Sequence, residues 1–354
     1  MKAEKDKKTG KWLIQYRYTD WQGKRRKSTK RGFATKREAE EWLRNFLITQ
    51  KADFDMKFED FWKMYCADME TRLWEHTMRT KKYIVELKIL PYFGNKRVND
   101  ITAADIRQWQ NELIKMGYSP TYLKTINNQL SAIFNYAVRY YDLKSNPCEK
   151  AGSMGKSKAE EMDFWTGEEF RKFIDSVMNK RLSYMAFMTL YWTGMRLGEL
   201  LALNPKDVDL KKRTISITKS YQRLGKKDVI TPPKTPKSRR VITIPEFLAA
   251  DIKDYMDSLY DLQEDDRLFP ITKYYLEHEM QRGIKESGVK RIRVHDLRHS
   301  HASMLIELGF SPLEIANRLG HEKVETTLNT YAHLYPNKQT KLAERLDSEY
   351  REDL

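Results

Sequence analysis

The chain has 354 residues, enough for two or three domains, and 40% of them are hydrophobic, so several cores are expected and a wholly disordered chain is excluded. Its 65 Lys and Arg against 50 Asp and Glu leave a net charge of +15, which favours a polyanionic partner. No run of about 18 apolar residues and no signal peptide are found, and two cysteines, Cys66 and Cys148, are too few for a disulfide scaffold. We therefore expect a reduced, cytoplasmic protein.

Residues 1–52 are expected to form a small basic domain, because residues 1–50 hold 15 Lys and Arg against 6 Asp and Glu. Apolar residues alternate over 12–18 as in a strand, the turn DWQG follows, and KRRKSTKRGF is typical of a second strand. Thr35 and Glu38 have capping-box spacing and predict a helix start. The basic strand could enter a DNA major groove or remain a solvated hairpin. Its candidate DNA contacts are Arg25, Arg26, Lys27 and Lys30.

Residues 53–148 are expected to form a helical bundle. Apolar residues recur every three or four positions, Ser119 and Pro120 predict a helix start, and Asn146 and Pro147 predict a stop. Four helices with short connections would result, and their aromatic stripes are expected to be core rather than a cofactor site. Residues 149–163 lack this periodicity and are predicted to be a flexible linker.

Residues 164–354 are expected to form an α+β domain. Thr166 and Glu169 predict a helix start, helical periodicity continues to residue 203, and short strands are expected near 214–217 and 240–244. Residues 219–240 hold eight Lys and Arg and one Asp, which predicts a basic hairpin. Its candidate DNA contacts are Lys226, Lys227, Arg239 and Arg240. The predicted fold class is therefore multidomain and mainly α, with small β elements.

Two motifs of this last domain can bind an anion. In TGMRLGEL, Arg196 follows a glycine turn at the start of a helix, where its planar guanidinium can face an anion, and Glu199 can steady it. In HDLRH, His295 and Arg298 are three residues apart and share a helix face, so both can converge on one ligand. Each motif by itself is a weak signal.

Three histidines near the HDLRH motif could bind a metal, and two tyrosines near the end of the chain could act as a nucleophile. His299, His301 and His321 are neighbours of the HDLRH motif, but no HExxH pattern or cysteine cluster accompanies them, so zinc is the weaker interpretation. We expect His299 and His301 to be packed or hydrogen-bonded structural residues. Tyr331 and Tyr335 lie one helical turn apart, and spacing alone does not choose between them.

Taken together, TGMRLGEL, PKTPKSRR, HDLRH and LGHEKVETTLNTY occur in an order that closely resembles the tyrosine recombinases, the family of phage and mobile-element integrases. The resemblance covers residues 164–354 most strongly. Residues 53–148 look like the family's core-site-binding domain, and residues 1–52 look like its arm-site-binding domain. The resemblance implies a site-specific recombinase that cuts and rejoins DNA through a covalent 3′-phosphotyrosine, integrating and excising a phage or mobile element.

The resemblance also implies roles for individual residues. Glu199 matches an acidic position beside the active site, and Lys237 is an alternative to Lys234 as the hairpin lysine. The phosphotyrosine keeps the energy of the broken bond, so the resemblance implies no ATP, metal ion or other cofactor. The residues that match the family's active-site positions are Arg196, Lys234, His295, Arg298, His321 and Tyr331.

The implied partners are double-stranded attachment sites of the core and arm types, further copies of this chain in a DNA-bound homotetramer, and an excisionase or host DNA-bending protein. The implied location is the bacterial cytoplasm, at the nucleoid and away from membranes. The tail KLAERLDSEYREDL either caps its own domain or exchanges with a neighbouring protomer. A non-catalytic sequence-specific DNA-binding regulator and a relaxing topoisomerase are the alternative functions.

Overall fold

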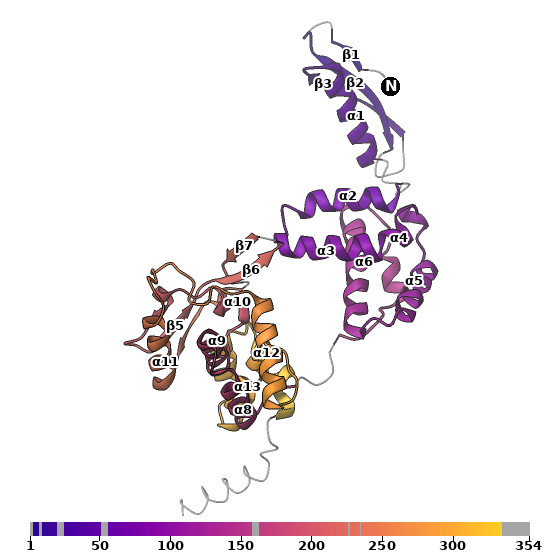
Figure 1. Cartoon of the computed structure of the whole chain (residues 1–354). Coiled ribbons are helices and arrows are strands. Elements are labelled where there is room, and N and C mark those ends of the chain that lie inside the picture. The colour runs from indigo at the N-terminus through magenta and orange to yellow at the C-terminus, as the bar shows by residue number, and fades with distance from the viewer. Residues whose placement is uncertain are drawn as a thin grey trace, which may run out of the picture. The chain divides into compact units, whose positions relative to one another are not determined.

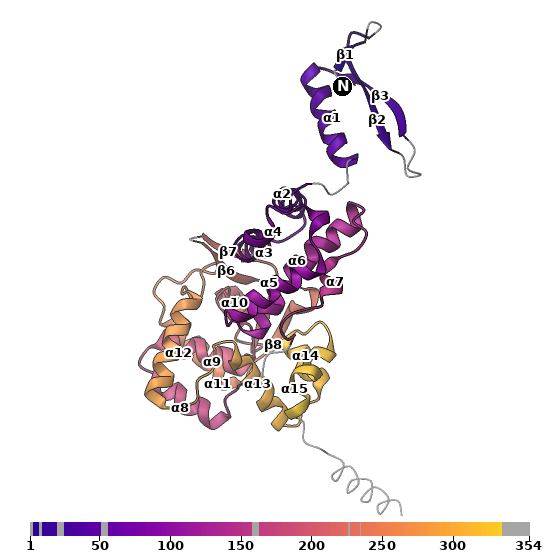
Figure 2. The same ribbon diagram turned by 90° about the vertical axis from the view of Figure 1, so that its right-hand side faces the viewer.

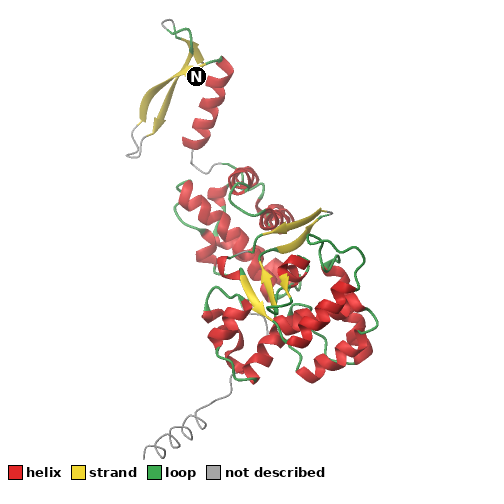
Figure 3. Cartoon of the chain, turned by 90° about the vertical axis from the view of Figure 1, so that its left-hand side faces the viewer, coloured by secondary structure: helices red, strands yellow, loops and turns green. Residues whose placement is uncertain are grey.

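The protein is described by a computed structural model, shown in Figure 1, that divides the chain into two compact units, Met1–Glu160 and Glu161–Leu354. The structure describes residues 3–6, 9–19, 25–50, 56–157, 163–225, 227–233 and 235–334. Helices dominate, and the strands form small antiparallel sheets (Figure 3), which confirms the predicted fold class. None of the described helices is both long and apolar enough to cross a membrane.

A small sheet packed on one helix begins the first unit. Its strands β1 (Ala3–Lys5), β2 (Trp12–Thr19) and β3 (Arg25–Phe33) are antiparallel in that order, and α1 (Lys36–Gln50) supplies the other half of the core. Ile14 from the sheet and Ala39 from the helix are fully buried there. The hydroxyl of Thr35 accepts a hydrogen bond from the Glu38 backbone N–H at 3.1 Å, so the predicted helix cap is confirmed.

A helical bundle makes up the rest of the first unit. Its aromatic stripes form the core, with Phe58, Phe61, Trp109 and Phe134 almost fully buried, as the sequence predicted. The hydroxyl of Ser119 caps the longest helix, and Pro120 occupies the first helical position. The bundle contains α2 (Phe58–Met69), α3 (Glu75–Lys88), α4 (Leu90–Phe93), α5 (Ala103–Lys115), α6 (Pro120–Tyr140) and α7 (Pro147–Ala151).

The chain stays packed on this bundle beyond residue 148, where the sequence suggested a flexible linker over 149–163. α7 runs to Ala151, and Met154 is 4% exposed within the bundle core. The backbone N–H of Lys156 donates to the carbonyl of Pro120 at 3.1 Å. The packing depends on two apolar side chains, Ala151 and Met154. Two residues are too few to form a recognisable helical periodicity in the sequence.

The second unit is built around α9 (Arg181–Thr193), which is apolar on almost all sides and buried. One sheet has the order β4-β5-β8, formed by β4 (Val208–Asp209), β5 (Thr214–Ile217) and β8 (Arg240–Thr243), and a separate hairpin pairs β6 (Ser220–Leu224) with β7 (Lys227–Thr231). The other helices are α8 (Gly167–Val177), α10 (Leu197–Leu200), α11 (Glu246–Asp257), α12 (Lys273–Ser287), α13 (Asp296–Glu307), α14 (Pro312–Leu319) and α15 (Val324–Tyr331).

The start of α13 is held in place from a distant part of the chain. The backbone N–H of Trp165 donates to the Ser300 hydroxyl at 2.9 Å, and the Trp165 indole N–H donates to the carbonyl of Lys290 at 2.8 Å. Thr166 and Glu169 form the predicted capping box directly after this tryptophan. The helices α13, α14 and α15 pack together at one end of the unit (Figure 2), so the residues they carry lie close to one another.

The packing of residues 149–157 can be tested at Gly155. A Cβ added there would lie 2.0 Å from the Pro120 carbonyl oxygen, and the backbone φ of +78° is strained for other residues. We expect Gly155→Ala to lower the free energy of unfolding of the bundle by about 2–4 kcal/mol. Gly117→Ala is the matched control, since its φ is +73° but open space surrounds it, and should cost about 1–2 kcal/mol. Calorimetry of the full chain measures both, and equal losses would contradict the close packing.

Candidate active site

A tight glycine turn places Arg196. Gly194 ends α9 in the left-handed conformation, with φ of +65°, and a Cβ at this position would lie 2.5 Å from the His301 ring and 2.8 Å from Leu319. Glycine is therefore required by both the backbone and the neighbouring side chains. The chain then turns so that Arg196 directly precedes α10.

The carboxylate of Glu199 is buried and fixes Arg196 by hydrogen bonds. It accepts a hydrogen bond from the Arg196 backbone N–H at 2.9 Å and one from the Arg196 guanidinium at 2.8 Å. The side chain of Glu199 is 2% exposed, whereas that of Arg196 is 38% exposed. Arg196 is thus fixed at one edge of its guanidinium and remains open to a ligand at the others.

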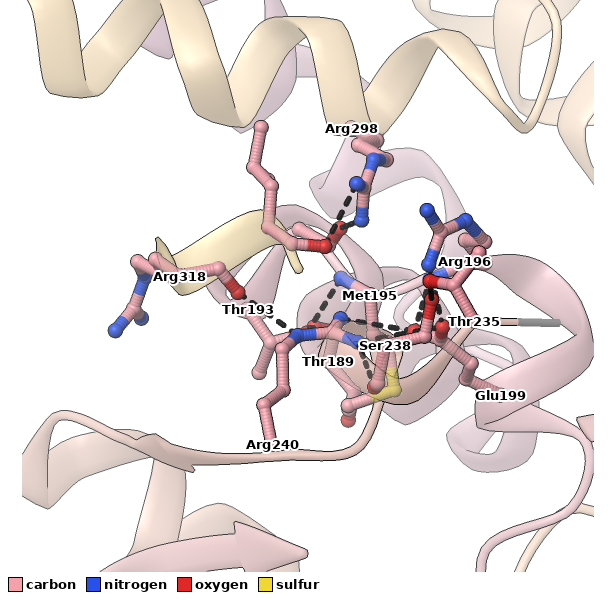
Figure 4. A network of polar contacts seen from close by, with 12 residues as sticks. Thr189, Thr193, Met195, Arg196, Glu199, Thr235, Ser238, Arg240, Arg298 and Arg318 are labelled. Carbon is pink, nitrogen blue, oxygen red and sulfur yellow. Dashed lines mark hydrogen bonds and ion pairs between the residues drawn. The ribbon is translucent and has the colours of Figure 1, made fainter. Parts of the chain in front are cut away.

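Arg240 is the second partner of this carboxylate (Figure 4). Its guanidinium donates to both oxygens of Glu199, at 2.9 and 3.3 Å, and also to the backbone carbonyls of Arg318 and Ser238, at 2.9 and 3.0 Å. Gly320 packs closely against the Arg240 side chain, so a Cβ added at Gly320 would lie only 3.0 Å from that side chain. Arg240 therefore joins α10, the segment before β8 and the end of α14.

This arrangement corrects the sequence interpretation of Arg240 as a DNA contact. Its side chain is 7% exposed and donates its hydrogen bonds to protein groups. One of these groups is the buried carboxylate of Glu199, which needs a charged partner. Burial by itself would raise the pKa of Glu199, but the hydrogen bond and charge of Arg240, together with Arg196, outweigh burial and lower it. Glu199 is therefore ionised at neutral pH.

Arg298 is held by backbone carbonyls from two other segments. Its guanidinium donates to the carbonyl of Gly194 at 2.8 Å and to that of Leu319 at 2.7 Å, and the residue is 4% exposed. Burial lowers the pKa of Arg298 to about 9, and the nearby positive charge of Arg196 adds to this shift. Arg298 and Arg196 lie close enough for their charges to interact, and together they form a site that favours an anion.

The two predicted histidines lie beside these arginines. His295 directly precedes α13, and burial followed by the charge of Arg298 lowers its pKa. His321 follows the left-handed Gly320 at the end of α14, and its Nδ1 is 2.7 Å from the Thr327 hydroxyl. Burial and the charges of Arg298 and Arg196 lower the pKa of His321 to about 4. Both imidazoles are neutral at pH 7.

Tyr331 ends α15 and is buried in a small apolar cluster. The residue is 2% exposed, and its hydroxyl lies 2.6 Å from Nδ1 of His299. Burial raises the pKa of Tyr331 to about 12, although Arg298 acts in the opposite direction. The apolar residues around it are Ala302, Leu305, Ile306, Ile315 and Leu319.

A cavity of about 680 Å³ opens beside the site. Arg196 and His295 form part of its wall, and the hairpin β6–β7 and helix α12 contribute Tyr221, Arg223 and Lys273. This cavity gives a ligand access to the exposed edge of Arg196.

The structure brings five of the six predicted active-site residues together, and Lys234 lies outside the described residues. Lys227 and Arg239 are exposed, as are Lys27 and Lys30 in the first unit. Lys237, the alternative lysine, donates to the Glu322 carbonyl at 3.0 Å, next to His321. The residues that converge are Arg196, His295, Arg298, His321 and Tyr331. Outside the described part of the chain lie Lys226, Lys234, Tyr335, the tail after residue 334, and the side chains of Arg25 and Arg26.

The histidines considered as zinc ligands have partners within the protein. His299 contacts Tyr331, and His301 accepts a hydrogen bond from the Arg318 guanidinium at 2.9 Å. Among the residues that the structure describes, no group of three or more His, Cys, Asp or Glu is arranged to hold a metal ion. The contact between His299 and Tyr331, and the link made by Arg240, were missed by the sequence analysis because both join segments far apart in the chain.

Comparison with known proteins gives matches along most of the chain. The phage integrase family model matches residues 164–338, the N-terminal SAM-like domain of phage integrases matches 57–114, and an arm DNA-binding domain matches 3–50. The ICEBs1 integrase of Bacillus subtilis is 33% identical over 306 residues, which is 82% of this chain and 83% of that protein. A XerC-like tyrosine recombinase of Caldanaerobacter subterraneus is 24% identical over 360 residues, or 88% and 90% of the two chains.

Two groups of solved structures share the fold. The Tn1549 transposon integrase bound to transposon right end DNA superimposes with a TM-score of 0.70 at 20% identity, covering 82% of this chain and 100% of that chain. A lambda integrase dimer bound to a core site superimposes with a TM-score of 0.61 at 17% identity, covering 96% and 95% of the two chains.

The role of Arg240 can be tested by comparing the two partners of Glu199. We expect Arg240→Gln to lower the free energy of unfolding of the second unit by about 3–5 kcal/mol, because it leaves a buried carboxylate without its main partner. Arg196→Gln, the matched control, should cost about 1 kcal/mol or less, since its guanidinium is partly exposed. Urea unfolding of the full chain measures both, and losses of the same size would contradict the assignment.

The buried histidines predict a pH dependence. Burial lowers the pKa of His299 and His321 to about 4 and that of His301 to about 3. Unfolded histidines take up protons near pH 6.5 and these native ones do not, so the free energy of unfolding should fall as the pH drops from about 6.5 to about 4. NMR of carbon-13-labelled imidazoles in the full chain should show the three rings still neutral at about pH 5.5. A titration midpoint near 6.5 would contradict the burial of that ring.

Proposed function

Because the chain belongs to the phage integrase family and is a tyrosine-type site-specific DNA recombinase, we propose that Tyr331 is the residue that attacks the scissile phosphodiester. The Tyr331 oxygen bonds to phosphorus, the bond to the 5′ oxygen breaks, and a 3′-phosphotyrosine and a free 5′ hydroxyl result. The hydroxyl of another strand then reverses the step, so the energy of the broken bond is retained and the reaction balances without ATP, a metal ion or another cofactor.

The pairing of Arg196 with Arg298 is the observation that carries this proposal. A phosphodiester is anionic and resists attack by an oxygen nucleophile. Two fixed guanidinium groups at its nonbridging oxygens would stabilise the additional negative charge that develops in the transition state. Glu199 and the carbonyls of Gly194 and Leu319 hold both arginines before DNA arrives, so little reorganisation is needed.

The remaining roles follow from position and chemistry. His321, with Nδ1 engaged by Thr327, would donate through its other ring nitrogen to the phosphate. His295, beside Arg298, is suited to general acid or base chemistry. A lysine of the segment before β8 would protonate the leaving 5′ oxygen, and we assign this to Lys234, with Lys237 as the alternative.

We propose that the domains of the chain, each with its own hydrophobic core, bind different DNA sites. Residues 1–52 would bind arm sites through β3, where Lys27 and Lys30 are exposed, and residues 53–148 would bind the core site. Residues 149–163 would connect the bundle to a catalytic domain over 164–354, with their first part packed on the bundle. Lys227 and Arg239 would add phosphate contacts within the catalytic domain.

We further propose that the protein integrates and excises a phage or mobile element as a homotetramer on paired attachment sites. A lambda integrase tetramer bound to a Holliday junction, which shares this fold with a TM-score of 0.59, supports that assembly. An excisionase or host DNA-bending protein would set the direction, and the reaction would take place in the bacterial cytoplasm at the nucleoid. The tail KLAERLDSEYREDL would exchange between protomers, with capping of its own domain as the alternative.

A covalent adduct tests the nucleophile. With a nicked suicide DNA carrying the sequence that flanks the coding region, the unmodified chain should form an adduct that survives denaturing electrophoresis. Tyr331→Phe should abolish the adduct and keep DNA binding, because it removes only the attacking oxygen. Tyr335→Phe is the matched control and should leave the adduct in place.

The same assay separates the alternatives. Loss of the adduct in Tyr335→Phe but not in Tyr331→Phe would transfer the role to Tyr335. A gel shift without any adduct from the unmodified chain would favour a non-catalytic regulator. Relaxation of supercoiled DNA without sequence preference would favour a topoisomerase.

A further inference from the structure

The hydroxyl of the proposed nucleophile contacts a histidine of the HDLRH motif to which the family resemblance gives no active-site role. His299 follows Arg298 in α13, and its Nδ1 is 2.6 Å from the Tyr331 oxygen. The two ring centroids are 5.6 Å apart. This separation lies at the short end of the range for a hydrogen bond from a hydroxyl group, so the phenol and the imidazole are in direct contact.

The contact between His299 and Tyr331 is buried, and a second ring packs against His299. His299 is 9% exposed and Tyr331 is 2% exposed. His295 lies edge to face against the other side of His299, with ring centroids 5.5 Å apart and an interplanar angle of 86°. A proton passing between His299 and Tyr331 would therefore move along a preformed hydrogen bond from which water is largely excluded.

Two other histidines of this unit are hydrogen-bonded to other groups, and Arg298 cannot accept a proton. Nδ1 of His321 contacts Thr327, and Nε2 of His301 accepts a hydrogen bond from Arg318. Arg298 is a guanidinium that donates only. Of the described residues, His299 is the one whose hydrogen bond to the Tyr331 hydroxyl is present in the structure.

We propose that His299 is a catalytic residue that accepts the proton of Tyr331 as this tyrosine attacks DNA, an inference that rests on the function proposed above. The O–H bond of Tyr331 breaks, its proton moves to Nδ1 of His299, and the tyrosine oxygen bonds to phosphorus. The bond from phosphorus to the 5′ oxygen breaks, and that oxygen takes a proton from the lysine or from His295. In the reverse step His299 returns its proton to the departing tyrosine.

DNA would prepare His299 for this role. In the free chain, burial lowers the pKa of His299 to about 4, and His295 and Arg298 contribute to that shift. A phosphate between Arg196 and Arg298 would add negative charge beside the ring, and more negative charge develops as phosphorus becomes five-coordinate. The charged and titratable groups that face His299 are His295, Asp296, Arg298 and Arg293 from its own helix and the turn before it, His321 after α14, and Tyr331 from α15.

Asparagine separates proton transfer from hydrogen bonding at this position. Its amide can occupy the place of Nδ1 and hydrogen-bond the phenol, but it does not accept a proton at neutral pH. We expect His299→Asn in the full chain to keep its melting temperature and DNA affinity and to form the adduct about 10²- to 10⁴-fold more slowly. His278→Asn, which changes an exposed histidine of α12, is the matched control and should cleave at the unmodified rate.

A sulfur-substituted DNA distinguishes the two ends of the reaction. When the 5′ bridging oxygen is replaced by sulfur, the leaving group needs no proton, so a variant that lacks the general acid recovers its rate. The slow cleavage by His299→Asn should persist on this DNA, because the missing function acts on the tyrosine. Recovery of the rate would assign His299 to the leaving group and overturn the proposal.

Retention of activity would also overturn it. Adduct formation by His299→Asn within about fivefold of the unmodified rate would show that a hydrogen bond is enough and proton acceptance is not needed. If that variant does not fold, His299→Gln supplies the same neutral amide and the same criterion applies. Failure of the proposed function is a separate outcome, because the unmodified chain would then form no adduct at all.

Discussion

The carboxylate of Glu199, buried between Arg196 and Arg240, is the interaction on which the active site depends. A buried carboxylate is stable only when it is paired and fully hydrogen-bonded, and here both oxygens contact guanidinium groups. Arg196 lines the neighbouring cavity, whereas Arg240 bonds only to protein groups among the contacts described. The same negative charge therefore positions the arginine proposed to bind the phosphate and joins three segments of the fold.

Backbone carbonyl groups at the end of α14 connect Arg240 to Arg298. Arg240 donates to the carbonyl of Arg318, and Arg298 donates to that of Leu319, the next residue in the chain. The left-handed Gly320 follows and leads directly to His321. The end of α14 thus supplies two hydrogen-bond acceptors and is followed by His321. A small movement there would displace Arg240, Arg298 and His321 together.

The proposed nucleophile, Tyr331, lies on a different helix, α15, and is held by different contacts. Tyr331 lies in an apolar cluster and keeps its proton, because burial raises its pKa while the neighbouring histidines remain neutral. A site with three arginines, one carboxylate, neutral imidazoles and a protonated phenol is short of negative charge. A DNA phosphate bound there, as proposed above, would supply that charge.

The sequence by itself determined the elements and the family of this protein, because helix caps and motifs depend on residues close together in the chain. Thr35, Ser119 and Thr166 cap helices where predicted, and the resemblance selected five residues that the fold brings together. Only the tertiary structure distinguished the buried Arg240 from its exposed neighbour Arg239, showed the packing of Met154, and placed His299 against Tyr331. These facts depend on contacts between segments up to 78 residues apart or on single buried side chains, and local sequence patterns do not encode them.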